Sequence, residues 1–448
     1  MRCRTRRSFI LVACLSVLPT LASASGHEAV PASTLFENVS IFDGVSSELR
    51  SGSVLVTGNE IAEVSSGKIA APAGATVIDG GGRVLSPGFI DLHAHLTYNV
   101  PRDQLFAHPW VVGAVAGKVA ESYLMNGFTT IRDAGGTHPD LARAIEAGVL
   151  TGPRVYPSGA VVSQTSGHGD FRLPHDPHPT FGNPNGNPWL NGGAAVIADG
   201  VAQTLTAVRE NLRHGATQIK IMGGGGVASD YDPIHTLQPS PEEIRAAVQA
   251  AGDWGTYVMA HSYTAPAIRR LVENGVKVIE HGLLIDDETA KLCADKGVVI
   301  STQIAIFRMG AELPGLAEKN RKKMLQVLEG QANLIALIKK YGIKTGFGTD
   351  FVFGSYPRVN QEFAARTEAF TPAEILRQAT SESAEIVRMA GKLDPYGRFG
   401  EIREGWLADL VLIDGDPLDD ITVLTDPQTN FKVIMKDGVV VKNALSSD

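Results

Sequence analysis

Two histidines separated by one residue, His93 and His95, end a short apolar run and could share one metal ion. The run, Phe89–His95, has the composition of a β-strand, where side chains alternate between faces, so both imidazoles point the same way. Imidazole nitrogen is a common ligand of zinc. An edge strand that carries two solvated histidines is the alternative for this motif alone, and the rest of the chain must decide between the two.

Further residues of metal-binding type follow later strand-like runs. His261 and His281 end two consecutive runs, and Asp350 ends the last one. Lys220 lies between two isoleucines in another run, so alternation places the lysine on the face opposite to both of them. If the isoleucines face helices, the ammonium group points into the protein, where it is costly unless something neutralises it. An ion pair with a buried carboxylate is the alternative for Lys220.

Alternating strand-like and helix-like segments predict the scaffold that holds these residues. Several predicted helices end in a glycine before the next strand, as at Gly215 and Gly275. Eight such units predict an α/β fold, a TIM-like (β/α)8 barrel, with the loops after the strands on the active face. The strands are expected at Phe89–His95, Thr129–Asp133, Arg154–Gly159, Gln218–Met222, Tyr257–His261, Val278–His281, Val298–Thr302 and Lys344–Asp350. The main helices are expected at Val111–Asn126, Ala198–His214, Pro241–Trp254, Ala265–Asn274, Asp286–Lys296 and Lys319–Tyr341.

Both ends of the chain are rich in short strands and turns. Each end alone has few strands and a small core, so pairing the two into one composite β-sandwich is the economical solution. We therefore predict that residues 25–86 form the N-terminal part of a small β-sandwich and residues 399–448 its C-terminal part, on either side of a barrel over residues 87–398.

The first residues predict an exported protein. Four arginines precede an apolar run that is too short to span a bilayer, and Ala22-Ser23-Ala24 provides a small-residue cleavage site. We expect residues 1–24 to be a secretory signal peptide, with some resemblance to a twin-arginine signal around Arg6 and Arg7. The mature protein is then expected in the periplasm or outside the cell, without a membrane anchor.

Composition narrows the class of protein. The chain has 448 residues, 44% of them hydrophobic and 20% charged, which allows a large core. The net charge of −8 argues against a nucleic-acid partner. Cys3 and Cys14 lie in the predicted leader, which leaves Cys293 alone, so an intrachain disulfide is excluded in the mature chain.

Several motifs surround these residues, namely the segment 86–95, Ile219-Lys220-Ile221 before Gly223–Gly226, Ala260-His261, Ile279-Glu280-His281-Gly282, Gly348-Thr349-Asp350, Ser166-Gly167-His168-Gly169-Asp170 and the segment 405–411. Together they resemble the amidohydrolase superfamily, in its binuclear branch with a carboxylated lysine. That branch contains imidazolonepropionase-like proteins and Xaa-Pro dipeptidases, and also amidases that hydrolyse ochratoxin A. The similarity runs from about Leu35 to Lys442.

The resemblance implies a site with two divalent metals, for which zinc suits the many imidazoles. In that site the metals lower the pKa of a bridging water. Asp350 passes a proton to the leaving amine, and loop residues His168 and Tyr231 contact the substrate near its carbonyl or carboxylate. The implied metal ligands are His93, His95 and Asp350 for one metal, His261 and His281 for the other, and Lys220, carboxylated by CO2, as the bridge.

The implied activity is hydrolysis of the amide bond to a C-terminal amino acid, in Xaa-Pro or other dipeptides, N-acyl amino acids or ochratoxin A. A small-molecule or dipeptide substrate is the expected partner, and the resemblance also implies a homo-oligomer, with an octamer as one form. Arg308 and Arg358 are candidates for pairing with a substrate carboxylate. Phe351 and Phe353 are candidates for an apolar wall.

Three alternatives stay open at this stage. A deaminase of the same superfamily would carry a glutamate shortly after the fifth-strand histidine, whereas Ser262-Tyr263-Thr264 offers no carboxylate. A cyclic-amide or sugar-amide hydrolase would use the same barrel. A non-catalytic assembly protein on a barrel without activity would usually have lost metal ligands, and here all the ligand positions are filled.

Overall fold

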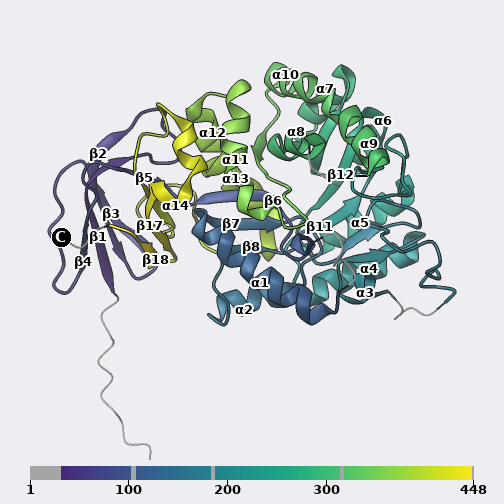
Figure 1. Cartoon of the computed structure of the whole chain (residues 1–448), viewed down its shortest axis with the longest axis horizontal. Coiled ribbons are helices and arrows are strands. Elements are labelled where there is room, and N and C mark those ends of the chain that lie inside the picture. Colours follow the sequence, from purple (N-terminus) through teal and green to yellow (C-terminus); the bar gives the residue numbers. More distant parts are fainter. Residues whose placement is uncertain (1–31, 102–106, 183–186, 313–316, 446–448) are drawn as a thin grey trace, which may run out of the picture.

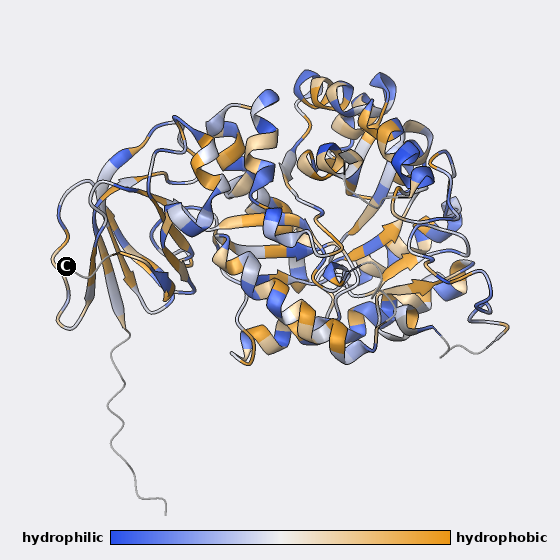
Figure 2. Ribbon diagram, viewed as in Figure 1, coloured by the Kyte–Doolittle hydropathy of each residue, from blue (hydrophilic) through white to orange (hydrophobic). Residues whose placement is uncertain are grey.

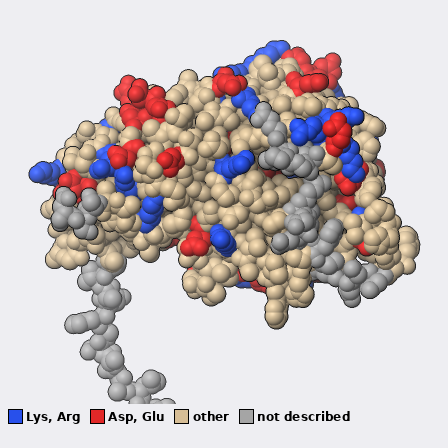
Figure 3. All heavy atoms as spheres, viewed as in Figure 1, with Lys and Arg blue, Asp and Glu red and all other residues tan. Residues whose placement is uncertain are grey.

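The computed structural model describes residues 32–101, 107–182, 187–312 and 317–445, which form a β-sandwich joined to an α/β barrel (Figure 1). The predicted signal peptide, residues 1–24, lies outside the described residues. Within the described ranges, every helix is too short or too polar to cross a membrane. On the face in Figure 3, cationic and anionic side chains are interspersed.

The sandwich is built from both ends of the chain, as predicted. In its eight-stranded sheet, β5 (Val84–Pro87) pairs in parallel with β1 (Ser33–Ile41) and antiparallel with β16 (Leu410–Ile413). Buried side chains from both ends, such as Phe36 and Leu412, share one core. The other strands of this sheet are β2 (Arg50–Thr57), β3 (Glu60–Ser65), β4 (Thr76–Asp79), β17 (Phe431–Lys436) and β18 (Val439–Asn443).

The barrel strands form two parallel arcs. A three-stranded sheet holds β6 (Phe89–Ala94), β7 (Phe128–Asp133) and β8 (Arg154–Tyr156). The second arc is a seven-stranded sheet in the order β10 (Ala195–Ile197), β9 (Val161–Ser163), β11 (Ile219–Met222), β12 (Val258–Thr264), β13 (Val278–Leu284), β14 (Val299–Thr302) and β15 (Thr345–Phe347). The two arcs meet at one seam, where Asp350 N donates to His93 O at 2.8 Å. This arrangement confirms the TIM-like barrel.

The third barrel strand differs from the continuous run predicted over Arg154–Gly159. It is split into β8 and β9, of which the first pairs with β7 and the second with β11. Gly159 has a φ of 71° at the break, a conformation that favours glycine. The side chain of Gln218 bridges the gap, because its Nε2 donates to Tyr156 O at 2.9 Å.

Helices cover the outside of the barrel, and hydrophobic side chains dominate the strands that they enclose (Figure 2). The single helix predicted over Lys319–Tyr341 is wrong, because α9 and α10 are separate. A Cβ at Gly330, between them, would lie 2.0 Å from Leu283 O, so only glycine fits where the chain passes β13. The helices are α1 (Pro109–Met125), α2 (Pro139–Glu146), α3 (Pro188–Asn191), α4 (Val201–His214), α5 (Pro241–Asp253), α6 (Ala265–Glu273), α7 (Asp287–Asp295), α8 (Ala305–Glu312), α9 (Glu318–Leu328), α10 (Gln331–Tyr341), α11 (Gln361–Ala365), α12 (Pro372–Ala379), α13 (Ser381–Val387) and α14 (Pro427–Asn430).

Candidate metal centre

A cavity of about 460 Å³ opens at the C-terminal ends of the barrel strands. The residues predicted as metal ligands all line this cavity, namely His93, His95, Lys220, His261, His281 and Asp350. The positions predicted from the sequence therefore converge on one space, although they come from five different strands.

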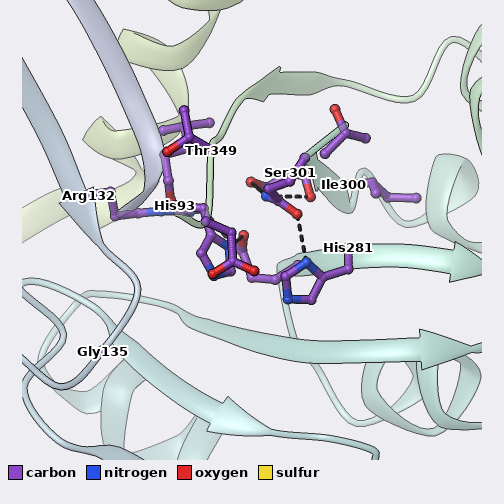
Figure 4. A network of polar contacts seen from close by, with 12 residues as sticks. His93, Arg132, Gly135, His281, Ile300, Ser301 and Thr349 are labelled. Carbon is purple, nitrogen blue, oxygen red and sulfur yellow. Dashed lines mark hydrogen bonds and ion pairs between the residues drawn. The ribbon is translucent and has the colours of Figure 1, made fainter. Parts of the chain in front are cut away.

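The ligands predicted for one metal lie in direct contact. His93 Nε2 is 3.2 Å from His95 Nε2, and these two atoms are 3.5 and 3.4 Å from Asp350 Oδ1. His281 offers a nitrogen within 4.8 Å of the donor atoms of His93 and Asp350. Figure 4 shows the neighbouring side chains of His93 and His281. Electron-pair donors at this spacing can bind a cation together.

Hydrogen bonds behind the rings fix which nitrogen is free. His93 Nδ1 donates to Glu280 Oε2 at 2.6 Å, His95 Nδ1 to Gly135 O at 2.8 Å, and His281 Nδ1 to Gln303 Oε1 at 2.7 Å. Because these oxygens accept, the proton is on Nδ1 and the lone pair on Nε2 faces the cavity.

His261 has the opposite orientation. Its Nε2 lies 3.3 Å from Gly225 O, a carbonyl that can only accept, so Nδ1 carries the free lone pair. The His261 ring packs against the His281 ring, with centroids 4.8 Å apart. The histidines of β12 and β13 therefore have adjacent rings, and in the described part of the chain each ring has one nitrogen free of a hydrogen bond to the protein behind it.

Burial keeps the imidazoles of His93, His261 and His281 neutral. Desolvation, with a further contribution from the charge of Lys220, lowers the pKa of His93 to about 4. Desolvation, followed by the proximity of His93, lowers the pKa of His281 to about 3, and burial holds the pKa of His261 well below its ordinary value. Neutral imidazole is the form that binds metal ions, so the donor set fits zinc or a similar divalent cation.

Lys220 takes the face that strand alternation predicts. The two isoleucines that flank it pack in the core, while Lys220 is 1% exposed and lines the cavity. Burial lowers the pKa of Lys220 to about 8, although the carboxylates of Glu280 and Asp350 act in the opposite direction. A lysine with this pKa has an appreciable fraction of neutral amine at neutral pH, which is the form that reacts with CO2.

Two of the predicted ligands have a strained backbone. His281 has a φ of 76° and Asp350 a φ of 56°, in the left-handed region that residues other than glycine seldom adopt. For Asp350, neighbouring contacts enforce this conformation, since Thr349 N and Oγ1 both donate to the buried carboxylate of Asp91. Strain of this kind is concentrated at functional sites.

Only some of the residues predicted to bind substrate line the cavity. His168 lines the cavity, with its ring centroid 4.1 Å from that of His261. Tyr231 is 46% exposed and is not part of the cavity lining, so its substrate role stays a prediction. Arg358 lines the cavity, whereas Arg308 lies outside the lining and is bound to Gln331 and Glu368.

The two phenylalanines that follow Asp350 also lie in different surroundings. Phe353 lines the cavity, and Phe351 is buried in the hydrophobic core. Sequence reasoning missed the aromatic side chains that complete the lining. Tyr263 had a detectable signal, because it lies two residues after His261 on the same strand and so on the same face. The others are Tyr98, Phe171, Trp189 and Phe307.

Glu280 was also missed as a functional residue. It is fully buried and bonds both His93 and Arg132, whose Nη2 lies 2.5 Å from Glu280 Oε1. Strict alternation would place Glu280 and the next residue, His281, on opposite faces. The left-handed φ of His281 lets both side chains point inward, and no sequence pattern reveals that angle.

Comparison with known proteins identifies the family. The model of the amidohydrolase family matches residues 84–442, and the chain belongs to this family. The ochratoxinase of Aspergillus niger is 34% identical over 356 residues, which cover 77% of this chain and 73% of that protein. These matches confirm the resemblance seen in the sequence.

Solved structures agree with this assignment. A prolidase in complex with N-methylphosphonate-L-proline has a TM-score of 0.85 and 36% identity, covering 92% of this chain and all of its own (100%). The A. niger ochratoxinase structure has a TM-score of 0.81 and 28% identity, with coverage of 93% and 96%. The protein is therefore a hydrolase that acts on amide C–N bonds, rather than a non-catalytic assembly protein.

Proposed function

We propose that this protein is a binuclear zinc amidohydrolase that cleaves the amide bond to a C-terminal amino acid with a free carboxylate. The observation that carries the proposal is the group of lone-pair donors on the cavity floor, His93, His95 and Asp350, within 3.5 Å of one another. In this proposal these three residues hold one zinc ion, His261 and His281 hold the other, and Lys220, carboxylated by CO2, binds both.

The metals, when bound, supply an activated water and polarise the amide carbonyl. The chain supplies the proton transfer. Burial raises the pKa of Asp350, but its contacts with His93 and His95 outweigh burial and hold that pKa well below its ordinary value. Asp350 is therefore ionised, accepts a proton from the attacking water and passes it to the amide nitrogen as the C–N bond breaks.

The cavity walls favour a substrate with apolar groups on both sides of the amide bond. Phe171 and Trp189 pack on each other in the lining, and aliphatic and aromatic side chains such as Ile306 and Phe307 line the cavity as well. Arg358 is on the same lining and offers a cation for a carboxylate. Relatives described as a prolidase and an ochratoxinase support proline or an aromatic amino acid as the released group.

The test is a panel of Xaa-Pro dipeptides and N-acyl amino acids, each paired with its C-terminal amide, assayed with zinc and bicarbonate. We expect kcat/KM to be at least about tenfold higher for each acid than for its amide. The amide lacks the carboxylate, so a cationic side chain that binds the acid is left unpaired. Equal values would indicate a general amidase. No cleavage of any amide by protein with two metals per chain would refute the proposal.

We also propose that the enzyme is exported after removal of residues 1–24 and that it assembles as a homo-oligomer. The arginine-rich leader supports export, and family membership supports assembly. Mass spectrometry of the mature protein, which identifies its first residue, tests the first statement. Gel filtration tests the second, and a stable monomer at micromolar concentration would contradict it.

A further inference from the structure

The ring of His168 is held from behind by a polar network in the loop after β11. His168 Nδ1 lies 2.5 Å from Ser229 Oγ and 3.4 Å from Asp232 Oδ2. On its other side the ring packs against His261, with centroids 4.1 Å apart, and it lines the cavity. The network therefore acts on a ring that is next to a predicted metal ligand.

Asp232 is a buried carboxylate with few other partners. Its side chain is fully buried, Oδ2 accepts a hydrogen bond from Gly226 N at 2.7 Å, and Oδ1 has no hydrogen bond among the described residues. Burial raises the pKa of Asp232, but hydrogen bonds from His168 and Ser229 and the charge of Lys323 keep it below its ordinary value. An ionised carboxylate accepts only, so the His168 nitrogen that faces it, Nδ1, carries a proton.

Lys323 of α9 fixes this loop from the opposite side. Its Nζ donates to the carbonyl oxygens of Gly226, Ser229 and Asp232, each at 2.9 Å, and lies 3.5 Å from Asp232 Oδ1. Asn320, one turn earlier, donates to Val227 O at 2.6 Å. One helix thus ties down the backbone of the loop and also pairs with its buried carboxylate.

The loop backbone itself is shaped to receive the ring. A Cβ on Gly226 would lie 1.9 Å from His168 Nδ1, so only glycine leaves room for the imidazole at this point. Burying a carboxylate and a lysine requires both charged groups to lose their hydration, and apolar residues could pack a loop without that desolvation penalty. Here the carboxylate faces one nitrogen of the His168 ring, and the lysine pairs with that carboxylate.

We propose that Asp232, together with Ser229, is a positioning residue that holds His168 by Nδ1 and so presents Nε2 to the substrate. Lys323 holds the loop in the required place. The inference rests on the proposed function, in which His168 contacts the substrate near its carbonyl.

A double-mutant cycle tests whether Asp232 acts through His168. The variants Asp232→Asn, His168→Ala and the double variant are compared as metal-loaded enzymes on the best acid of the substrate panel. Asparagine keeps the shape of the side chain but removes the charge, and we expect kcat/KM to fall about tenfold or more, mainly through kcat. In the His168→Ala background the same substitution should change kcat/KM by less than about twofold. Losses that multiply would overturn the inference.

The chain provides a matched control on the same helix. Lys319 of α9 pairs with Asp230 of the same loop at 3.1 Å but is 55% exposed and makes none of the carbonyl contacts. Lys323→Met should lower kcat/KM several-fold, whereas Lys319→Met should change it by less than about twofold. Equal losses in both variants would refute a specific role of Lys323.

A structural measurement does not depend on turnover. In a crystal structure of the metal-loaded Asp232→Ala variant, we expect the His168 ring to rotate or to adopt two orientations. An unmoved ring would overturn the inference. Failure of the proposed function is distinguishable, because it would show in the wild-type enzyme as an absence of amide cleavage, while the ring could still be seen to move.

Discussion

Replacing Glu280 by glutamine should weaken metal binding as well as the fold. Glu280 is fully buried, with Oε1 2.5 Å from Arg132 Nη2 and Oε2 2.6 Å from His93 Nδ1. Burial raises the pKa of Glu280, but Arg132 and His93 outweigh it and keep the carboxyl ionised. Glutamine keeps the shape but leaves Arg132 as an uncompensated buried cation and gives His93 a weaker acceptor.

The size of both effects follows from these contacts. Breaking a buried ion pair from one side costs about 3–5 kcal/mol of folding stability. Loss of the acceptor behind a metal-binding histidine typically reduces metal affinity by about 10–100-fold. Urea denaturation of the metal-free protein measures the first effect. Competition with a chelator of known affinity measures the second.

A second buried pair serves as the control. Asp409 lies 2.5 Å from Arg154 at the junction of barrel and sandwich, and both side chains are at most 2% exposed. Asp409→Asn should also reduce stability but leave the metal dissociation constant within about twofold. The reasoning would be refuted if Glu280→Gln bound metal like the wild type, or if Asp409→Asn weakened metal binding equally.

Three further substitutions test the site. Lys220→Ala should abolish most activity and lower the metal content, because two cations would repel each other without a bridging anion; normal metal content and turnover would end the bridging proposal. Asp350→Asn should keep the fold but reduce the rate by about 10²-fold or more; a rate that only halves, with metal content unchanged, would point to another proton carrier. Gly226→Ala should displace the His168 ring, whose Nδ1 would lie 1.9 Å from the new Cβ, and reduce kcat/KM by at least about tenfold; wild-type kinetics would contradict this.

Much of the barrel and of the metal site could be predicted because both depend on local periodicity. Strand alternation places Lys220 on the cavity side once its isoleucine neighbours are taken to face the helices, and both isoleucines do pack in the core. The position of a residue at the end of a parallel strand also fixes which face of the barrel it joins, and this brings His261 and His281 together.

The errors occur where backbone geometry departs from the regular pattern. The third strand is interrupted at Gly159, and the helix predicted over Lys319–Tyr341 is interrupted near Gly330, where Leu283 O leaves no room for a side chain. A helical or strand-like run of residues carries no signal for such contacts, since the contacting atom belongs to a distant part of the chain.

The same reason explains why the residues behind the ligands could not be predicted. Glu280 is 187 positions away from His93, and Ser229 is 61 positions away from His168, so only the folded barrel brings each acceptor to its ring. Sequence pattern states which way a histidine points within its own strand. The atom behind the ring decides which nitrogen is free to bind metal or substrate, and a position predicted as a ligand becomes a working site only when that acceptor is present. The strained φ angle of His281 belongs to the same requirement, because it aims inward a side chain that strict alternation would have turned away.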